Sequence, residues 1–145
     1  MSGNIQRVAE MSESHFNRIY LTCPIIYRGR HDDLKKSLMS FGFCCGEGWF
    51  YLINELSQQV EIIANQQKND GCADDDLPIV VQVKEKFGGL RFYMRNQTEA
   101  ISSLIEAAEA KSYRVCEVCG QPGATYRDDG WYRTECDSCR LKIKE

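Results

Sequence analysis

Four cysteines toward the C-terminus have the spacing of a structural metal site. Cys116 and Cys119 form one C-x2-C pair, Cys136 and Cys139 form a second, and sixteen residues separate the pairs. Each pair places two sulfurs on one tight turn, and two such turns complete the tetrahedron of thiolates that zinc prefers. Because four protein sulfurs leave no open coordination position, we expect one structural Zn²⁺ that stabilises the fold and does not catalyse a reaction.

Two disulfides, a four-thiolate iron site and an iron–sulfur cluster are the alternatives for these cysteines. Disulfides are disfavoured because the polar residues that follow Met1 do not resemble the apolar core of a signal peptide. This absence indicates a reduced, cytoplasmic protein. The spacing itself suits zinc and iron alike.

The residues between the two cysteine pairs predict a small hairpin. Residues 124–127 and 131–135 have the pattern of short strands around Asp128-Asp129-Gly130, a three-residue connection with glycine where a hairpin needs it. We expect Trp131 and Tyr126 to cover one side of it. Since so short a segment buries little apolar surface, the metal would supply most of its folding free energy, on the order of 10 kcal/mol.

Length and composition indicate one compact domain with a small appendage. The chain has 145 residues, 43% of them hydrophobic, and a net charge of -3, which gives no overall bias toward nucleic acid. No apolar run is long enough to cross a bilayer. We expect an N-terminal arm or helix at 1–30, an α+β body with a central hairpin at 31–114, and a zinc ribbon at 115–145.

Periodic apolar residues predict the helices of the body. A long amphipathic helix at 47–67 and a second at 99–114 are expected to pack against a small antiparallel sheet. A short helix over 32–39 and a helix or partly ordered arm over 5–20 have weaker patterns. The stripe of the long helix consists of Trp49, Leu52, Ile53, Leu56, Val60 and Ile63.

The central hairpin is predicted from two alternating segments, 79–87 and 90–95, that flank Gly88-Gly89. A turn at the two glycines would place Phe87 opposite Leu90. One face would then be mostly apolar, and the other would carry four cations around a tyrosine. We call Lys84, Lys86, Arg91 and Arg95 the hairpin cations; the tyrosine is Tyr93.

The hairpin cations are the best candidate for an interaction surface, because like charges on neighbouring strands repel unless an acidic group meets them. They would contact an acidic protein surface or phosphates, with Tyr93 available to stack on a base. The alternative is a solvated face whose lysines prevent edge-to-edge aggregation.

Three other groups of residues are weaker candidates. Cys44 or Cys45 could be a reactive thiol, but neither His15 nor His31 has the spacing of a catalytic partner, so packing is the favoured role. The acidic run at 74–76 lacks the spacing of a calcium loop. A second metal site would need residues at irregular intervals, namely Cys23, His31, Cys45 and Cys72.

Several segments together resemble a family of small uncharacterised proteins from phages and bacterial genomes. They are FGF at 41–43, CGEGWF at 45–50, VVQVKEKFGGLRFY at 80–93, CEVCGQPG at 116–123 and GWYRTECDSC at 130–139. The resemblance covers most of the chain from about Tyr20 to Cys139. It implies a phage or mobile-element accessory protein acting inside a bacterium, and it implies no activity.

The leading hypothesis is a non-enzymatic, zinc-stabilised module that binds a host or phage protein, with inhibition of a host defence system as one instance. It depends on the closed metal site and on the lack of a recognisable catalytic constellation. The second hypothesis is a nucleic-acid-binding protein that uses the hairpin cations and Tyr93. The third is an enzyme that uses Cys44 or Cys45.

Overall fold

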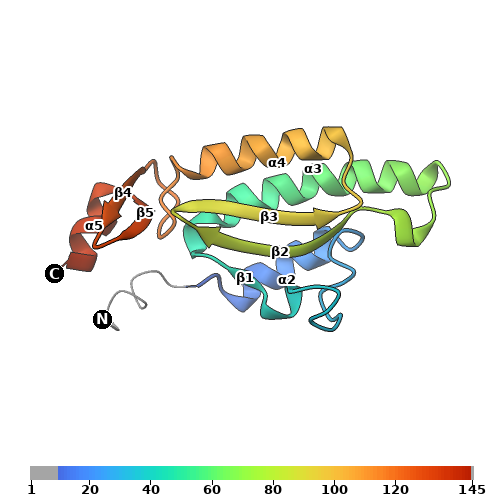
Figure 1. Cartoon of the computed structure of the whole chain (residues 1–145), viewed down its shortest axis with the longest axis horizontal. Helices are drawn as coiled ribbons and strands as arrows, with labels where there is room; N and C mark the ends of the chain where they lie inside the picture. The colour runs from blue at the N-terminus through green and yellow to red at the C-terminus, as the bar shows by residue number, and fades with distance from the viewer. Residues whose placement is uncertain (1–9, 145) are drawn as a thin grey trace.

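The computed structural model describes residues 10–144, and the predicted α+β class is confirmed (Figure 1). A three-stranded sheet has the order β1-β2-β3, with β1 at Phe43–Cys44, β2 at Ile79–Lys86 and β3 at Gly89–Arg95. The helices of the body are α2 at Glu13–Thr22, α3 at Phe50–Asn69 and α4 at Glu99–Ser112. A C-terminal unit contains the hairpin of β4, Ala124–Asp128, and β5, Trp131–Glu135, followed by α5 at Asp137–Lys144.

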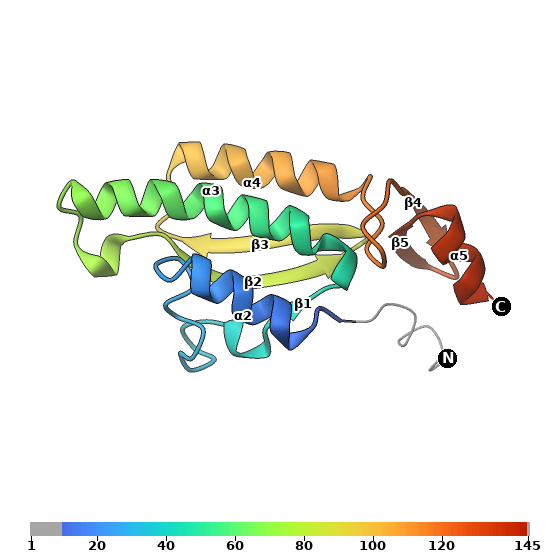
Figure 2. The same cartoon turned by 180° about the vertical axis from the view of Figure 1, so that it is seen from behind.

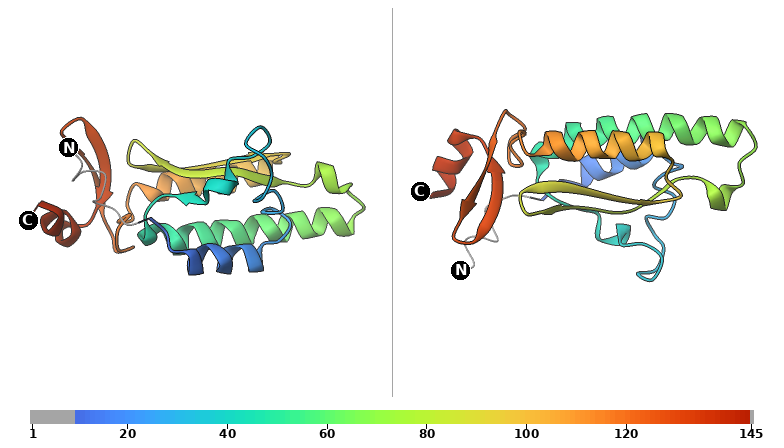
Figure 3. Two further views of the ribbon diagram at one scale, coloured as in Figure 1. Left: turned by 90° about the horizontal axis from the view of Figure 1, so that it is seen from below. Right: turned by 45° about the horizontal axis from the view of Figure 1, so that its top comes forward.

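All three body helices lie on one side of the sheet. Figure 2 shows α2 and α3 in front of the strands, and Figure 3 shows the strands as a separate layer. Val80, Val83, Leu90 and Phe92 point into this interface and are buried. Among residues 10–144 no helix covers the opposite side, which we call the outer face; Figure 1 views the sheet from that side.

The two long predicted helices are confirmed. The 3₁₀ helix η2 at Glu47–Trp49 leads into α3, whose predicted stripe lies in the core apart from the partly buried Ile63. Thr98 caps α4 by accepting a hydrogen bond from the backbone N–H of Ile101. Both helices therefore form where the apolar period and the flanking residues predict them.

The N-terminal part of the chain contributes to the same core. Of the predicted helix or arm over 5–20, residues 5–9 lie outside the described part of the chain, and α2 begins at Glu13. Ile19, Ile26 and Tyr27 are fully buried. The carbonyl of Ile26 also accepts a hydrogen bond from the backbone N–H of Val80, which connects this segment to β2.

The prediction of a short helix over 32–39 is wrong. The segment forms turns and the 3₁₀ helix η1 at Met39–Phe41, after which Gly42, at φ 73°, leads into β1. Leu38 donates its backbone N–H to the carbonyl of Val81 on β2, so this donor is used by the neighbouring strand and not by a helix. The parallel pairing of β1 with β2 was not predicted.

The predicted hairpin exists, but its turn lies one residue earlier than expected. Lys86 pairs with Gly89, and the two connecting residues are Phe87 at φ 55° and Gly88 at φ 84°. Gly89 instead allows the Tyr113 ring to pack against the strand, because a Cβ at this position would lie 2.3 Å from that ring. The shift leaves the paired residues 82–86 on their predicted faces, since the pairing moves by two residues and the side-chain period is two. Phe87 is the exception: it was expected on the apolar face opposite Leu90, but it lies in the turn and is 62% exposed.

The free edge of β3 is closed by α4. The backbone N–H of Leu90 donates to the Ser112 hydroxyl at 2.9 Å, and that of Phe92 donates to the Glu109 carboxylate at 3.0 Å. These contacts occupy donors that would otherwise pair with an added strand. This edge is therefore less open to a partner than the outer face, where residues 34–38 lie beside Gln82 and Tyr93 and no helix of residues 10–144 covers the strands.

Candidate metal centre and binding surface

The four predicted metal ligands converge in the C-terminal unit. The sulfurs of Cys116, Cys119, Cys136 and Cys139 all lie within 4.8 Å of one another. The sulfurs of Cys119 and Cys136 are 3.6 Å apart, which is too far for a disulfide. This distance is close to the sulfur–sulfur separation of about 3.8 Å that tetrahedral geometry and Zn–S bonds of about 2.3 Å require. The site can therefore hold a metal ion, and its donor set fits zinc.

Local elements explain this convergence. Gly120 follows the second cysteine at φ 82°, and its N–H donates to the carbonyl of Cys116. This bond closes the turn that carries Cys116 and Cys119, which we call the first knuckle. The second pair lies at the start of α5, a helix that was not predicted. There the backbone N–H of Cys139 points at the sulfur of Cys136 and lowers the pKa of that thiol to about 7.

The ribbon hairpin differs from prediction at its turn and at one aromatic residue. Asp128 pairs with Trp131, so Asp129 and Gly130 form a two-residue connection with φ values of 51° and 85°. Trp131 is 64% exposed and does not cover the ribbon as expected. Tyr126 is partly buried, and the guanidinium of Arg140 lies 3.7 Å from the centre of its ring. The helix α5 thus covers this side of the hairpin.

The first knuckle packs directly on the start of the long helix. Gly48 donates its N–H to the carbonyl of Glu117 at 2.8 Å, and the indole N–H of Trp49 donates to the carbonyl of Val115 at 2.8 Å. A Cβ on Gly48 would lie 2.2 Å from the Cys116 carbonyl oxygen. Only a glycine fits at this approach of two backbones.

A buried carboxylate lies at the same junction. Glu117 is 7% exposed and accepts a hydrogen bond from the Gly46 N–H at 2.7 Å. Burial raises the pKa of Glu117 to about 7 despite that hydrogen bond, and the neighbouring carboxylates of Glu85 and Glu135 add to the rise. No local pattern indicates this group of carboxylates, because Glu85, Glu117 and Glu135 are far apart in the chain.

The hairpin cations lie on the outer face, but the two arginines are hydrogen-bonded within the protein and the two lysines are less engaged. Arg91 reaches the edge of the sheet and donates to the Tyr113 hydroxyl and the Leu90 carbonyl. Arg95 donates to the carbonyl of Lys36 at the far end of β3. Lys84 is partly exposed and Lys86 exposed, and within residues 10–144 neither forms an ion pair with a carboxylate. The lysines are therefore the more available charges.

Tyr93 is 41% exposed on the same face, and the ammonium of Lys84 lies 6.0 Å from the centre of its ring. The exposed Cys44 on β1 is the neighbour of Lys84 on its other side. The outer face thus combines two available lysines with one aromatic ring.

Three of the remaining thiols have a raised pKa. Burial raises the pKa of Cys23 to about 11 and raises that of Cys45 well above its usual value. Burial and the Glu10 carboxylate also raise the pKa of the Cys44 thiol. Across residues 10–144 no second metal-binding group is assembled, so the candidate site with His31 and Cys72 does not form there.

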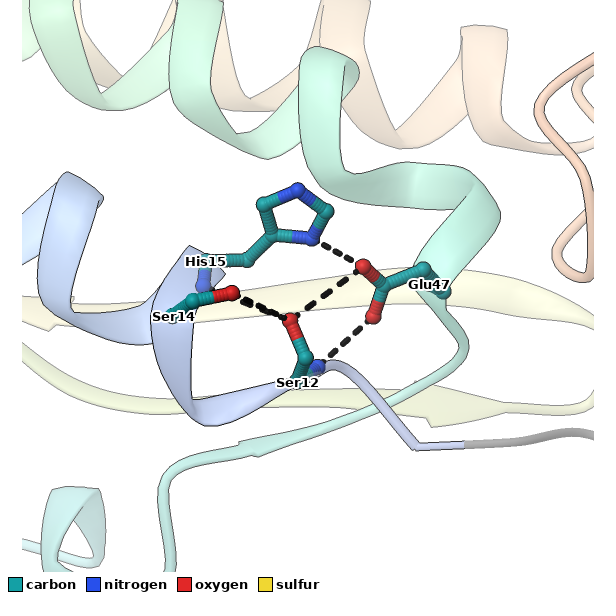
Figure 4. A network of polar contacts seen from close by, with 4 residues as sticks. All are labelled: Ser12, Ser14, His15 and Glu47. Carbon is teal, nitrogen blue, oxygen red and sulfur yellow. Dashed lines mark hydrogen bonds and ion pairs between the residues drawn. The ribbon is translucent and has the colours of Figure 1, made fainter.

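His15 and Glu47 form an ion pair that the sequence did not predict (Figure 4). Glu47 also accepts a hydrogen bond from the backbone N–H of Ser12, the residue that caps α2. The imidazole stacks on the ring of Phe50 with centroids 3.9 Å apart. Ser12 contacts the carboxylate and Ser14, not the imidazole, so the cluster connects α2 to η2 and lacks the relay of a serine hydrolase.

No protein-family model, no curated protein and no solved structure matches this chain. No helix within residues 10–144 is both long and apolar enough to span a membrane.

Proposed function

We propose that this protein is a non-enzymatic, zinc-stabilised module that binds an acidic surface of a partner protein through the outer face of its sheet. The observation that carries the proposal is the position of Lys84 and Lys86 on a face that no helix of residues 10–144 covers. Tyr93 adds an exposed aromatic ring, a residue type that is enriched where proteins bind one another.

The rest of the body supports a role for this face. The opposite face packs against the helices, and Ser112 and Glu109 occupy the outward N–H groups of Leu90 and Phe92 on β3. Strand addition at that edge is thus disfavoured. Binding through the face would instead use side chains, with charge complementarity determining association rate and partner choice.

The closed cysteine site supports a structural role for the metal, since four thiolates leave no position for water or substrate. The resemblance to phage and bacterial proteins extends the proposal: the partner would be a host or phage protein inside a bacterium, and inhibition of a defence system is one form of such binding. The chain would then act by occupying a surface of its target.

The test is affinity capture from bacterial lysate with tagged, zinc-loaded protein, with and without nuclease, followed by mass spectrometry. We expect a stoichiometric protein that survives nuclease treatment. Lys84→Glu with Lys86→Glu should abolish its capture, because both lysines lose their charge complementarity.

The matched control carries Lys68→Glu and Lys111→Glu, which make the same change in charge on exposed residues of α3 and α4. It should capture the partner normally. Capture that disappears with nuclease would contradict a protein partner, and undiminished capture by the Lys84/Lys86 variant would exclude the outer face.

A further inference from the structure

Two exposed aromatic rings meet where the tip of the central hairpin contacts the C-terminal ribbon. Phe87 is 62% exposed and Tyr132 is 43% exposed. Their ring centres are 6.3 Å apart and their planes are at 89°. The ammonium of Lys86 lies 5.4 Å from the centre of the Phe87 ring, and the guanidinium of Arg127 lies 5.8 Å from that of Tyr132. We call these four residues the tip platform.

The two halves of the tip platform are held together by short contacts. The Thr134 hydroxyl donates to the carbonyl of Gly88 at 2.6 Å and is 2.7 Å from the hydroxyl of Thr125. A Cβ on Gly88 would lie 3.1 Å from a Thr125 methyl carbon, so the turn lies close against the ribbon. The two backbone segments that carry the rings are therefore held together before any ligand arrives, which lowers the entropy cost of binding.

Phe87 occupies a backbone conformation that disfavours its residue type. Its φ of 55° lies in the left-handed region at the first position of a two-residue turn, where asparagine, aspartate or glycine is preferred. Burial of the ring does not offset the cost of this backbone conformation, since most of the Phe87 side chain is exposed. An aromatic residue that is both strained and exposed points to use of the ring by a ligand.

Two of the nearby carboxylates lie on faces other than the tip platform, and a third, Asp129, is exposed in the turn that adjoins Arg127. Glu85 points to the other face of β2, and its carboxylate accepts the N–H of Gly88. Asp128 pairs with Trp131, and both lie on the face of the ribbon opposite Arg127 and Tyr132. The platform therefore presents two cations and two aromatic faces together.

We propose that the tip platform binds single-stranded nucleic acid, with unpaired bases stacking on Phe87 and Tyr132 and phosphates contacting Lys86 and Arg127. Aromatic rings flanked by cations are the recurring solution for single strands, because every base has a π face and every nucleotide a phosphate. Rings at right angles require the strand to bend between two bases. This function goes beyond the proposed protein binding and shares only Lys86 with it.

The probe is a fluorescein-labelled oligothymidylate of twelve nucleotides, and its fluorescence anisotropy is measured with full-length, zinc-loaded protein at low salt. We expect saturable binding that is weaker for a duplex of the same length, because paired bases cannot stack on the rings. Affinity should also fall as salt rises, with a slope of log K against log salt concentration of about -0.7 per phosphate contacted.

Two substitutions test the rings. Phe87→Asn keeps a residue that tolerates positive φ, and Tyr132→Thr keeps a β-branched residue in the strand. Each should weaken binding roughly five-fold or more. Trp131→Thr is the matched control, since Trp131 is an exposed aromatic residue on the other face of the same hairpin, and its removal should change affinity less than two-fold.

The proposal would be overturned if the oligonucleotide did not bind at low salt or if the duplex bound with equal affinity. It would also be overturned if both ring variants kept their affinity, or if Trp131→Thr lost as much affinity as they do. Binding of an acidic peptide such as oligoglutamate without binding of the oligonucleotide would assign the platform to a protein ligand instead. Lys84→Glu separates the two proposals, because Lys84 lies on the outer face and is not part of the tip platform. Oligonucleotide binding should persist in this variant when partner capture is reduced.

Discussion

Lys84 on β2 lies directly opposite Arg91 on β3, so two like charges are cross-strand neighbours. The guanidinium of Arg91 extends to the Tyr113 hydroxyl at the sheet edge, while Lys84 stays beside Tyr93. Like charges in this arrangement reduce stability. The chain therefore retains an unfavourable pair on the face that we propose as its binding surface.

Replacing Lys84 should affect stability and binding in opposite directions. Lys84→Glu changes the repulsion with Arg91 into attraction, and we expect the free energy of unfolding to rise by about 0.2–1 kcal/mol. Partner capture should fall in the same variant. Urea denaturation and affinity capture measure the two effects, and a loss of both stability and capture would indicate a structural role for Lys84.

Removing the metal should unfold the C-terminal unit before the body. We expect one zinc per chain by native mass spectrometry and none in Cys119→Ser, because three thiolates bind zinc more weakly than four. After chelation, hydrogen exchange should increase across β4 and β5 while α3 stays protected.

Cys44→Ser is the control for metal removal, since it alters an exposed thiol outside the cluster. It should retain a full equivalent of zinc. Full metal content in Cys119→Ser, or uniform loss of protection across the chain, would contradict the predicted separation of metal site and body.

Adding a methyl group at Gly48 should disrupt the contact between the ribbon and α3. The Cβ of Gly48→Ala would lie 2.6 Å from the Gly120 nitrogen as well as close to the Cys116 carbonyl, and both are backbone atoms. We expect a loss of about 1–3 kcal/mol in the free energy of unfolding. Gly71→Ala is the comparison, because no atom lies within 4 Å of its Cβ position and only the φ of 94° adds a cost. Equal losses in both variants would argue against the close approach.

The buried Glu117 should make stability depend on pH. Its pKa is raised from 4.5 to about 7 in the folded protein, so the folded state binds a proton more tightly than the unfolded state. The contribution of the protonated carboxyl is fully present below about pH 4.5 and is lost as the pH rises through 7. Unfolding of wild type and Glu117→Gln at saturating zinc, from pH 5 to 8, checks this. The wild type should lose stability relative to the variant, and a constant difference would contradict it.

The turn of the central hairpin can be tested with two substitutions. Phe87→Asn should leave stability unchanged or raise it by up to about 1 kcal/mol, because Asn-Gly suits a turn with two positive φ values. Gly89→Ala should lower it by about 1–3 kcal/mol, since its Cβ overlaps the Tyr113 ring. Chemical denaturation measures both, and a larger loss in Phe87→Asn would favour a turn at Gly88-Gly89.

Local patterns were sufficient for the long helices, both hairpins and the four-cysteine group. These features depend on periodicity or on fixed spacing within a short stretch, so the residues that define them are neighbours in sequence. The assignment of Lys84 and Lys86 to one face also follows from the two-residue period of a strand. That assignment survived the shift of the turn for the same reason.

Other features depend on contacts between distant segments, and only the tertiary structure decided them. The Tyr113 ring takes the space beside Gly89 and thereby gives the positive φ to Phe87. The hydrogen bond of Leu38 to β2 replaces a predicted helix. The sequence by itself determined which residues could bind a metal or carry charge, because residue type and spacing are local. The fold decided that Phe87 meets Tyr132 and that Glu117 is buried, because packing brings together residues that the chain separates.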